Sequence, residues 1–241
     1  MKKGILAGYF LAGYPDIPSS IALMKKSLPA VDVFEIGYPS GDPFLDGDTI
    51  RRAHKKAFEA GGPPDIAFWQ ELRKALDRPL WIMAYRDTFI SRGLYREFAE
   101  QKLADALVLP DCADEERFAL QEELSVLGVE VVGFANSETP PEQFGKIASR
   151  HKTIYFQLYQ GKTGLAGKRE RDPSAYIDAV KAFPGVKLLA GFGIDSAERS
   201  RSLMQKGFDG VIVGTALLEA LNKSEENMLR LIRDISRALG E

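Results

Sequence analysis

Residues 31–61, VDVFEIGYPSGDPFLDGDTIRRAHKKAFEAG, contain an apolar run, a loop and an amphipathic stretch, in that order. The run Val31–Ile36 predicts a buried strand, and Ile50–Gly61 predicts a helix that ends where glycines and prolines follow. The loop Tyr38–Asp48 between them contains two prolines and two glycines, which together set its path. This strand–loop–helix unit predicts an α/β protein, and the same rhythm continues on both sides of it.

Seven further apolar runs resemble the one at Val31–Ile36. They are nearly continuous rather than alternating, which is typical of parallel strands that are covered on both faces. A second helix, Ile66–Leu76, precedes the third strand, and Glu225–Leu239 predicts a helix near the end of the sequence. The other predicted strands are Ile5–Leu11, Leu80–Ala84, Ala106–Leu109, Val129–Phe134, Thr153–Leu158, Val186–Ala190 and Gly210–Val213.

Eight strands that alternate with helices over 241 residues favour a single (β/α)8 barrel, also called a TIM barrel, spanning residues 1–241. An open, doubly wound sheet is the alternative, because strand counting alone does not exclude it. The loops that follow the strands of such a barrel meet at one face and build the site. The candidate residues are therefore those at and just after the carboxyl end of each strand.

Composition excludes several classes of function. The net charge is −2 and no cluster of Lys and Arg stands out, so nucleic-acid binding is not expected. The single cysteine, Cys112, rules out an intramolecular disulfide, and two histidines without metal-ligand spacing argue against a metal site. No stretch approaches the roughly 20 apolar residues of a membrane helix. We therefore expect a cytoplasmic protein without a membrane span or a bound metal.

Glycines cluster in three late loops, after the sixth, seventh and eighth predicted strands. Glycine lets the backbone approach a ligand closely, and backbone N–H groups at a helix start favour an anion. Asp195 is expected to cap the helix after the seventh strand. Barrels of this kind often bind phosphate in their last loops, so a phosphorylated ligand is predicted, although each glycine alone would fit a turn. The glycines are Gly161, Gly164, Gly167, Gly191, Gly193 and Gly214, with Thr215 after the last.

Acidic residues cluster at the second strand and its loop. Glu35 lies within the apolar strand end, where burial should raise its pKa and suit it to proton donation. Asp42, Asp46 and Asp48 follow in the loop, where an acid in a different environment can take the complementary role. Two alternatives remain open at this point: the aspartates could form turns and caps, with Asp48 as a helix cap, or hold Mg²⁺.

Motifs spread over nearly the whole chain, in the same order, resemble those of the tryptophan synthase α subunit family. The most specific signature is Phe34-Glu35-Ile36-Gly37 with Pro39, Asp42-Pro43 and Asp46-Gly47. The other matching segments are Ala12-Gly13-Tyr14-Pro15-Asp16, Leu109-Pro110-Asp111, Gly161-Lys162-Thr163-Gly164, Gly191-Phe192-Gly193-Ile194 and Gly210-Val211-Ile212-Val213-Gly214-Thr215.

The resemblance implies a lyase of tryptophan biosynthesis that cleaves indole-3-glycerol phosphate to indole and glyceraldehyde 3-phosphate. It implies that Glu35 is the acid–base group and that Asp46 hydrogen-bonds the indole N–H. It also implies a β subunit as partner in an α2β2 assembly, with pyridoxal phosphate only in that partner and no cofactor in this chain. The substrate-binding residues implied by the match are Tyr155, Gly164, Phe192, Gly193, Gly214 and Thr215.

The chain departs from the family pattern between the two acids. Pro39-Ser40-Gly41-Asp42-Pro43 replaces the usual Pro-Phe-Ser-Asp-Pro, and Asp48 replaces a usual proline. An extra glycine and a lost proline should loosen a loop that, in the family, closes near the site and helps to bind the β subunit. Two other functions stay as alternatives: an α-like subunit that mainly activates a β subunit, and a different phosphate-sugar isomerase or epimerase.

Overall fold

The computed structural model describes residues 4–159 and 172–240. Its strands pair in parallel throughout. The strands are β1 (Ile5–Leu11), β2 (Val33–Gly37), β3 (Leu80–Met83), β4 (Ala106–Val108), β5 (Glu130–Val131), β6 (Gly133–Asn136), β7 (Thr153–Gln157), β8 (Lys187–Gly191) and β9 (Gly210–Val213).

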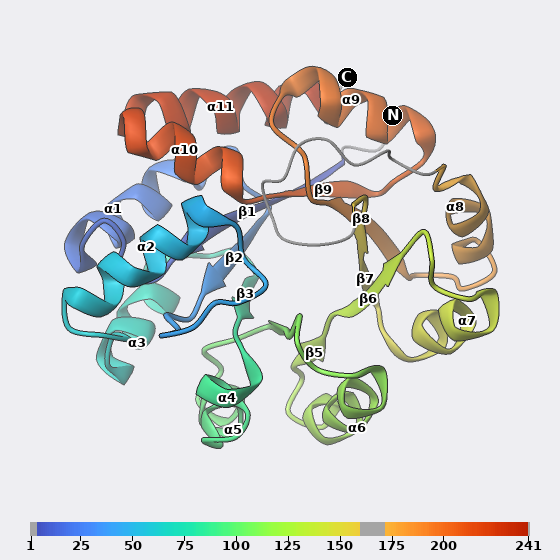
Figure 1. Ribbon diagram of the computed structural model, residues 1–241, viewed down its shortest axis with the longest axis horizontal. Coiled ribbons are helices and arrows are strands. Elements are labelled where there is room, and N and C mark those ends of the chain that lie inside the picture. The colour runs from blue at the N-terminus through green and yellow to red at the C-terminus, as the bar shows by residue number, and fades with distance from the viewer. Residues whose placement is uncertain (1–3, 160–171, 241) are drawn as a thin grey trace.

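The strands form a barrel, with helices arranged around them (Figure 1). Their order is β5-β4-β3-β2-β1-β9-β8-β7-β6, and only Val132 separates the two end strands in the sequence. The Val132 N–H still donates to the Leu107 carbonyl at 2.9 Å, so β5 and β6 are two parts of the predicted fifth strand. The barrel prediction is confirmed, and the open-sheet alternative is wrong because the end strands follow one another directly.

The helices include the predicted extra helix before the third strand, α3, and the predicted final helix, α11. A short helix, α4, and a longer one, α5, together connect β3 to β4. The helices are α1 (Ile17–Ser27), α2 (Asp48–Glu59), α3 (Ile66–Ala75), α4 (Arg86–Phe89), α5 (Leu94–Glu100), α6 (Asp114–Ser125), α7 (Pro141–Arg150), α8 (Ser174–Val180), α9 (Ala197–Lys206), α10 (Thr215–Lys223) and α11 (Glu225–Ala238).

Two sets of buried side chains form the core. The larger set, with Phe34, Ile36 and Leu72 among its members, lies between the strands and the helices. The smaller set includes the inward-facing residues of the strands, such as Val33 of β2, together with side chains of α2 and α10. Successive side chains of a strand point to opposite faces, so Glu35 points into the barrel, on the same side as Val33. An ionisable residue therefore occupies an inward position of the kind that Val33, on the same strand, fills with an apolar side chain.

Two predicted helix caps are wrong by one residue. Asp48 was expected to cap α2, but Gly47 is the cap, and Asp48 is the first helical residue. Asp195 was expected to cap α9, but the Ser196 side chain accepts the hydrogen bond from the Arg199 N–H at 3.2 Å. Both aspartates still lie at the positive end of a helix dipole, which favours acidic side chains. Among the residues that the structure describes, no helix is long and apolar enough to cross a membrane.

Candidate active site

Glu35 lies near the carboxyl end of β2 and points into the barrel, with 4% of its surface exposed. Burial and, to a smaller extent, the nearby negative charge of Asp46 together raise the pKa of its carboxyl group to about 8. Because this value lies above neutral pH, most Glu35 side chains carry a proton at pH 7. The carboxyl group can therefore donate a proton and afterwards accept one.

Asp46 reaches the same interior from the loop between β2 and α2, and only 2% of its surface is exposed. The hydroxyl of Tyr85, which follows β3, donates a hydrogen bond of 2.7 Å to Asp46 Oδ2. The ring of Phe44 packs on Tyr85 with centroids 5.3 Å apart. A donated hydrogen bond favours the charged form of a carboxylate. Glu35 and Asp46 thus differ in their surroundings, as an acid and a charge-stabilising group should.

Residues 39–48, which depart from the family pattern and are called the altered loop below, are attached to α2 and β1 by hydrogen bonds to His54. The Ser40 N–H donates to His54 Nδ1 at 3.0 Å, and His54 Nε2 lies 3.2 Å from the Tyr9 hydroxyl. Within the loop, the Asp42 N–H donates to Ser40 Oγ at 3.2 Å. Burial lowers the pKa of His54 to about 4, so its ring is neutral near pH 7. The replacement residues of this loop therefore take part in a defined set of contacts.

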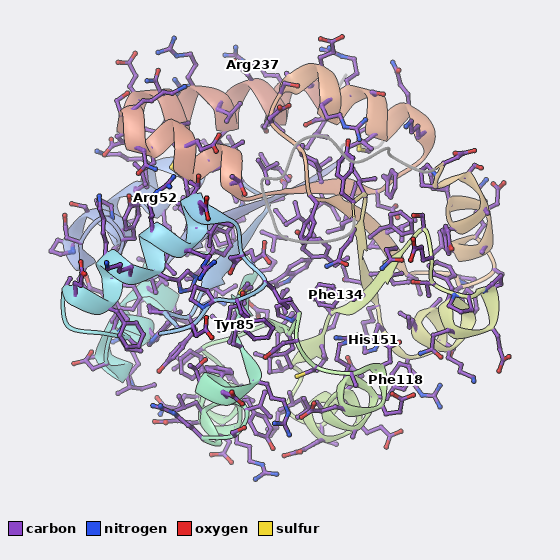
Figure 2. All side chains as sticks on the ribbon, viewed as in Figure 1. Arg52, Tyr85, Phe118, Phe134, His151 and Arg237 are labelled. Atoms are coloured by element: carbon purple, nitrogen blue, oxygen red, sulfur yellow. The ribbon has the colours of Figure 1, made fainter. Side chains whose placement is uncertain are left out.

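Aromatic side chains form the opposite wall. Tyr155 on β7 is buried and stacks on Phe134 of β6, with centroids 5.2 Å apart. Phe192 meets Tyr155 edge to face at 5.9 Å. The guanidinium of Arg117 lies 5.1 Å from the Phe134 centroid, and Figure 2 shows Phe134 across the centre of the molecule from Tyr85. A flat apolar ligand would find stacking partners on this side.

The loops after β8 and β9 are distinguished by the conformation of their backbone. Gly193 has φ of +69° and Phe192 has φ of +72°, a region that residues other than glycine rarely adopt. For Phe192 this conformation is strained, and the surrounding structure must hold it in place. Strained backbone of this kind clusters at active sites and ligand sites. Gly214 follows β9 directly and Thr215 begins α10, so the first backbone N–H groups of a helix lie at this rim. The predicted Gly164 lies outside the described residues.

The structure does not gather the loop acids into a metal site. Asp46 is buried, whereas Asp42 and Asp48 are exposed. In residues 4–159 and 172–240, no three His, Cys, Asp or Glu side chains form a group that could hold a metal ion. The magnesium alternative therefore has no support in this part of the chain, and the acid–base hypothesis for Glu35 and Asp46 is the one that the geometry favours.

The site belongs to the class of α/β barrels that carry their chemistry at the carboxyl ends of the strands. Residues 1–239 match the family model described as tryptophan synthase alpha chain. The chain therefore belongs to the tryptophan synthase alpha chain family. Members of this family cleave indole-3-glycerol phosphate in tryptophan biosynthesis, and membership supports that role, and a lyase activity, for this chain.

Two curated relatives carry the name tryptophan synthase alpha chain. The one from Caldicellulosiruptor saccharolyticus is 29% identical, with 99% of this chain and 94% of the relative covered. The one from Thermococcus kodakarensis is 30% identical, with coverages of 99% and 97%. Because each alignment covers nearly all of this chain and of the relative, the similarity extends through the whole barrel.

Solved structures agree with the fold. A tryptophan synthase subunit alpha from Legionella pneumophila superposes with a TM-score of 0.83 at 26% identity, covering 99% of this chain and 94% of that one. A Mycobacterium tuberculosis tryptophan synthase chain gives 0.86 at 24% identity, with coverages of 98% and 93%. At 24% identity the second likeness establishes the fold alone.

Sequence reasoning missed three residues around the acids: Tyr85, His54 and Tyr9. No local pattern linked Tyr85 to the acids, because its bond to Asp46 joins two segments 39 positions apart. His54 had no distinctive spacing, because its partners lie in a loop and on another strand. The inward face of the first strand was the one available signal for Tyr9, since alternate residues of a strand share a face.

Proposed function

We propose that this chain itself cleaves the carbon–carbon bond of indole-3-glycerol phosphate, with Glu35 and Asp46 as its catalytic residues. The observation that carries the proposal is the buried Glu35, whose pKa of about 8 keeps it protonated beside an Asp46 that receives a hydrogen bond from Tyr85. Two carboxyl groups in such different surroundings divide the roles of proton donor and charge stabiliser.

In the proposed reaction, Glu35 transfers its proton to the indole ring carbon that carries the glycerol chain. The ring nitrogen gains positive charge, which the Asp46 carboxylate stabilises. Glu35, now a carboxylate, accepts the proton of the hydroxyl group on the adjacent chain carbon. That oxygen forms the aldehyde of glyceraldehyde 3-phosphate while the carbon–carbon bond breaks, and the bonding electrons return to the ring to give indole.

The remaining predicted residues would hold the two ends of the substrate. Tyr155 and Phe192 would pack against the indole ring, as the edge-to-face contact between them allows. The phosphate would lie against backbone N–H groups at the rim of β8 and β9. No step needs a cofactor in this chain. The phosphate residues are Gly193, Gly214 and Thr215, together with Gly164 outside the described residues.

We also propose that the chain acts as one domain in the cytoplasm and binds a β subunit, which holds pyridoxal phosphate, in an α2β2 assembly. The altered loop and α2 border a hollow of about 410 Å³. Arg51, Arg52 and Lys55 line it together with Phe58, which is 40% exposed. Phe44 of the same loop is 46% exposed. Apolar groups ringed by charge are typical of a protein-binding surface.

An indole-release assay on the purified chain, with and without a β subunit, tests the proposed function. Indole formed by the chain alone, and faster in the complex, is the expected result. A chain that releases no indole but accelerates the β reaction would be an activating subunit instead. A chain inactive in both assays that isomerises a sugar phosphate would contradict the lyase assignment.

A further inference from the structure

Tyr9 lies between the two ends of the proposed substrate. Strand β1 pairs with β2 on one side, where Tyr9 is opposite Glu35, and with β9 on the other, where Gly8 is opposite Val213. Gly214 follows Val213, and a β-carbon built there would lie 3.5 Å from that of Tyr9. A ligand with its phosphate at Gly214 and its reacting carbon at Glu35 must therefore pass over β1.

The Tyr9 ring extends toward the carboxyl end of the neighbouring strand. A β-carbon at Gly37, two residues after Glu35, would collide with the Tyr9 hydroxyl, so the hydroxyl lies over that glycine. Burial raises the pKa of Tyr9, and the charge of Asp46 raises it further, so the hydroxyl keeps its proton. Tyr9 thus presents a protonated hydroxyl close to both acids.

His54 determines how that hydroxyl is used. It is completely buried, and its Nδ1 accepts a hydrogen bond from the Ser40 N–H. A neutral imidazole that accepts at Nδ1 carries its hydrogen on Nε2, which then donates to the Tyr9 oxygen 3.2 Å away. An oxygen that accepts this bond keeps its own hydrogen for another acceptor. The arrangement therefore directs the Tyr9 proton away from His54, toward the interior of the barrel.

We propose that Tyr9 donates a hydrogen bond to an oxygen of the substrate's glycerol chain, and that His54 is a positioning residue for this donor. The inference rests on the proposed function. The indole nitrogen is itself a donor, and the phosphate is assigned to the rim of β8 and β9. The glycerol hydroxyl oxygens, which join those two ends, are the acceptors left for Tyr9.

The first test compares two ligands with the parent and Tyr9→Phe proteins. One ligand is indole-3-glycerol phosphate, and the other is 3-(indol-3-yl)propyl phosphate, which lacks both glycerol hydroxyls. Tyr9→Phe removes one oxygen and should lower kcat/KM for the substrate about tenfold, the typical effect of one lost hydrogen bond. Its affinity for the deoxy ligand should match the parent within twofold. Tyr95→Phe, whose hydroxyl contacts Glu123 on α6, is the matched control and should change neither value.

An equal loss toward both ligands would show that Tyr9 acts through packing and would overturn the proposal. The proposal would also be overturned if the parent binds the deoxy ligand and Tyr9→Phe has the parent's kcat/KM for the substrate. That outcome would leave the proposed function intact. A parent that binds neither ligand and releases no indole would overturn the proposed function, and this inference with it.

The second test concerns His54. His54→Gln keeps an N–H near the Nε2 position and should retain most of the activity, whereas His54→Leu should lose as much kcat/KM as Tyr9→Phe. The double variant Tyr9→Phe/His54→Leu should be no worse than either single variant, because residues that act through one contact are not additive. Strictly additive losses, with His54→Gln as impaired as His54→Leu, would assign His54 a packing role and contradict its part in the proposal.

Discussion

Two parts of the barrel rim offer different groups to a ligand. The residues at and just after the carboxyl ends of β1–β3 form a side-chain rim, and those that follow β8 and β9 form a backbone rim. The first uses side chains whose properties depend on burial, such as Glu35 with its pKa of about 8 and Asp46 with its bond from Tyr85. The second uses the chain itself, with φ of +69° at Gly193 and a helix start at Thr215. Proton transfer requires tuned carboxyl groups, whereas a phosphate group needs only a ring of N–H donors.

The largest effect is expected at the side-chain rim. Glu35→Gln removes the proton donor and keeps its shape, so indole formation should fall by a factor of about 10² to 10⁴. Binding of a phosphorylated ligand should persist. Glu130→Gln is the control, because Glu130 is also largely buried but begins β5 at the amino ends of the strands. Parent-like turnover by Glu35→Gln would refute the mechanism.

At the backbone rim, a substitution should weaken ligand binding instead of proton transfer. Gly193→Asp places a carboxylate at the predicted phosphate and forces a side chain onto a residue with positive φ, where its β-carbon would collide with the Tyr159 ring. Affinity for inorganic phosphate and for the substrate should fall about 100-fold or more, as measured by calorimetry. Gly185→Asp also has positive φ but open space around it, and it should leave affinity unchanged. Equal affinities in all three proteins would reject the phosphate assignment.

The stability of the folded protein should depend on pH through Glu35 of the side-chain rim. An exposed glutamate has a pKa near 4.5, and the folded state raises that of Glu35 to about 8. The folded protein therefore holds a proton that the unfolded chain loses between these values, so the free energy of unfolding should fall as pH rises through this window. At about 1.4 kcal/mol for each unit, the Glu35 contribution amounts to a few kcal/mol. Denaturant unfolding at pH 5 and pH 9 should show this fall in the parent and much less of it in Glu35→Gln; parallel behaviour would contradict the raised pKa.

A smaller effect is expected at Tyr85. Tyr85→Phe keeps the ring that packs on Phe44 but removes the donor to Asp46. Since hydrogen bonds to charged groups contribute about 1.5–3 kcal/mol, kcat/KM should fall about 10- to 100-fold. Steady-state kinetics checks this, and an unchanged kcat/KM would mean that Asp46 needs no help from this hydroxyl.

The smallest effect tests the corrected cap at the backbone rim. Ser196→Ala should lower the free energy of unfolding by about 1 kcal/mol, because Ser196 caps α9. Asp195→Ala should cost less, since the Asp195 side chain precedes the cap. Chemical denaturation of both variants decides between them, and a larger loss at Asp195 would restore the original prediction.

The sequence predicted what depends on local pattern. Apolar runs located the strands that the structure describes, and Glu35 was found because an acid inside an apolar strand end is conspicuous. The caps Gly47 and Ser196 were not predicted, because the neighbouring Asp48 and Asp195 are also favoured cap residues. The break at Val132 was not predicted, because the run Val129–Phe134 contains no local signal that marks it. The site residues that were missed, Tyr85, His54 and Tyr9, act through contacts between distant segments, and the spacing of residues along the chain does not predict such contacts.

The account depends most directly on the protonation state of Glu35. The measurement is the titration of the Glu35 side-chain carboxyl carbon by NMR in selectively labelled protein, with Glu35→Gln to assign the signal. A midpoint near pH 8 is the predicted result, because burial and the charge of Asp46 both oppose ionisation. A midpoint near 4.5, the ordinary value for glutamate, would leave no proton on Glu35 at neutral pH and would contradict its role as the acid.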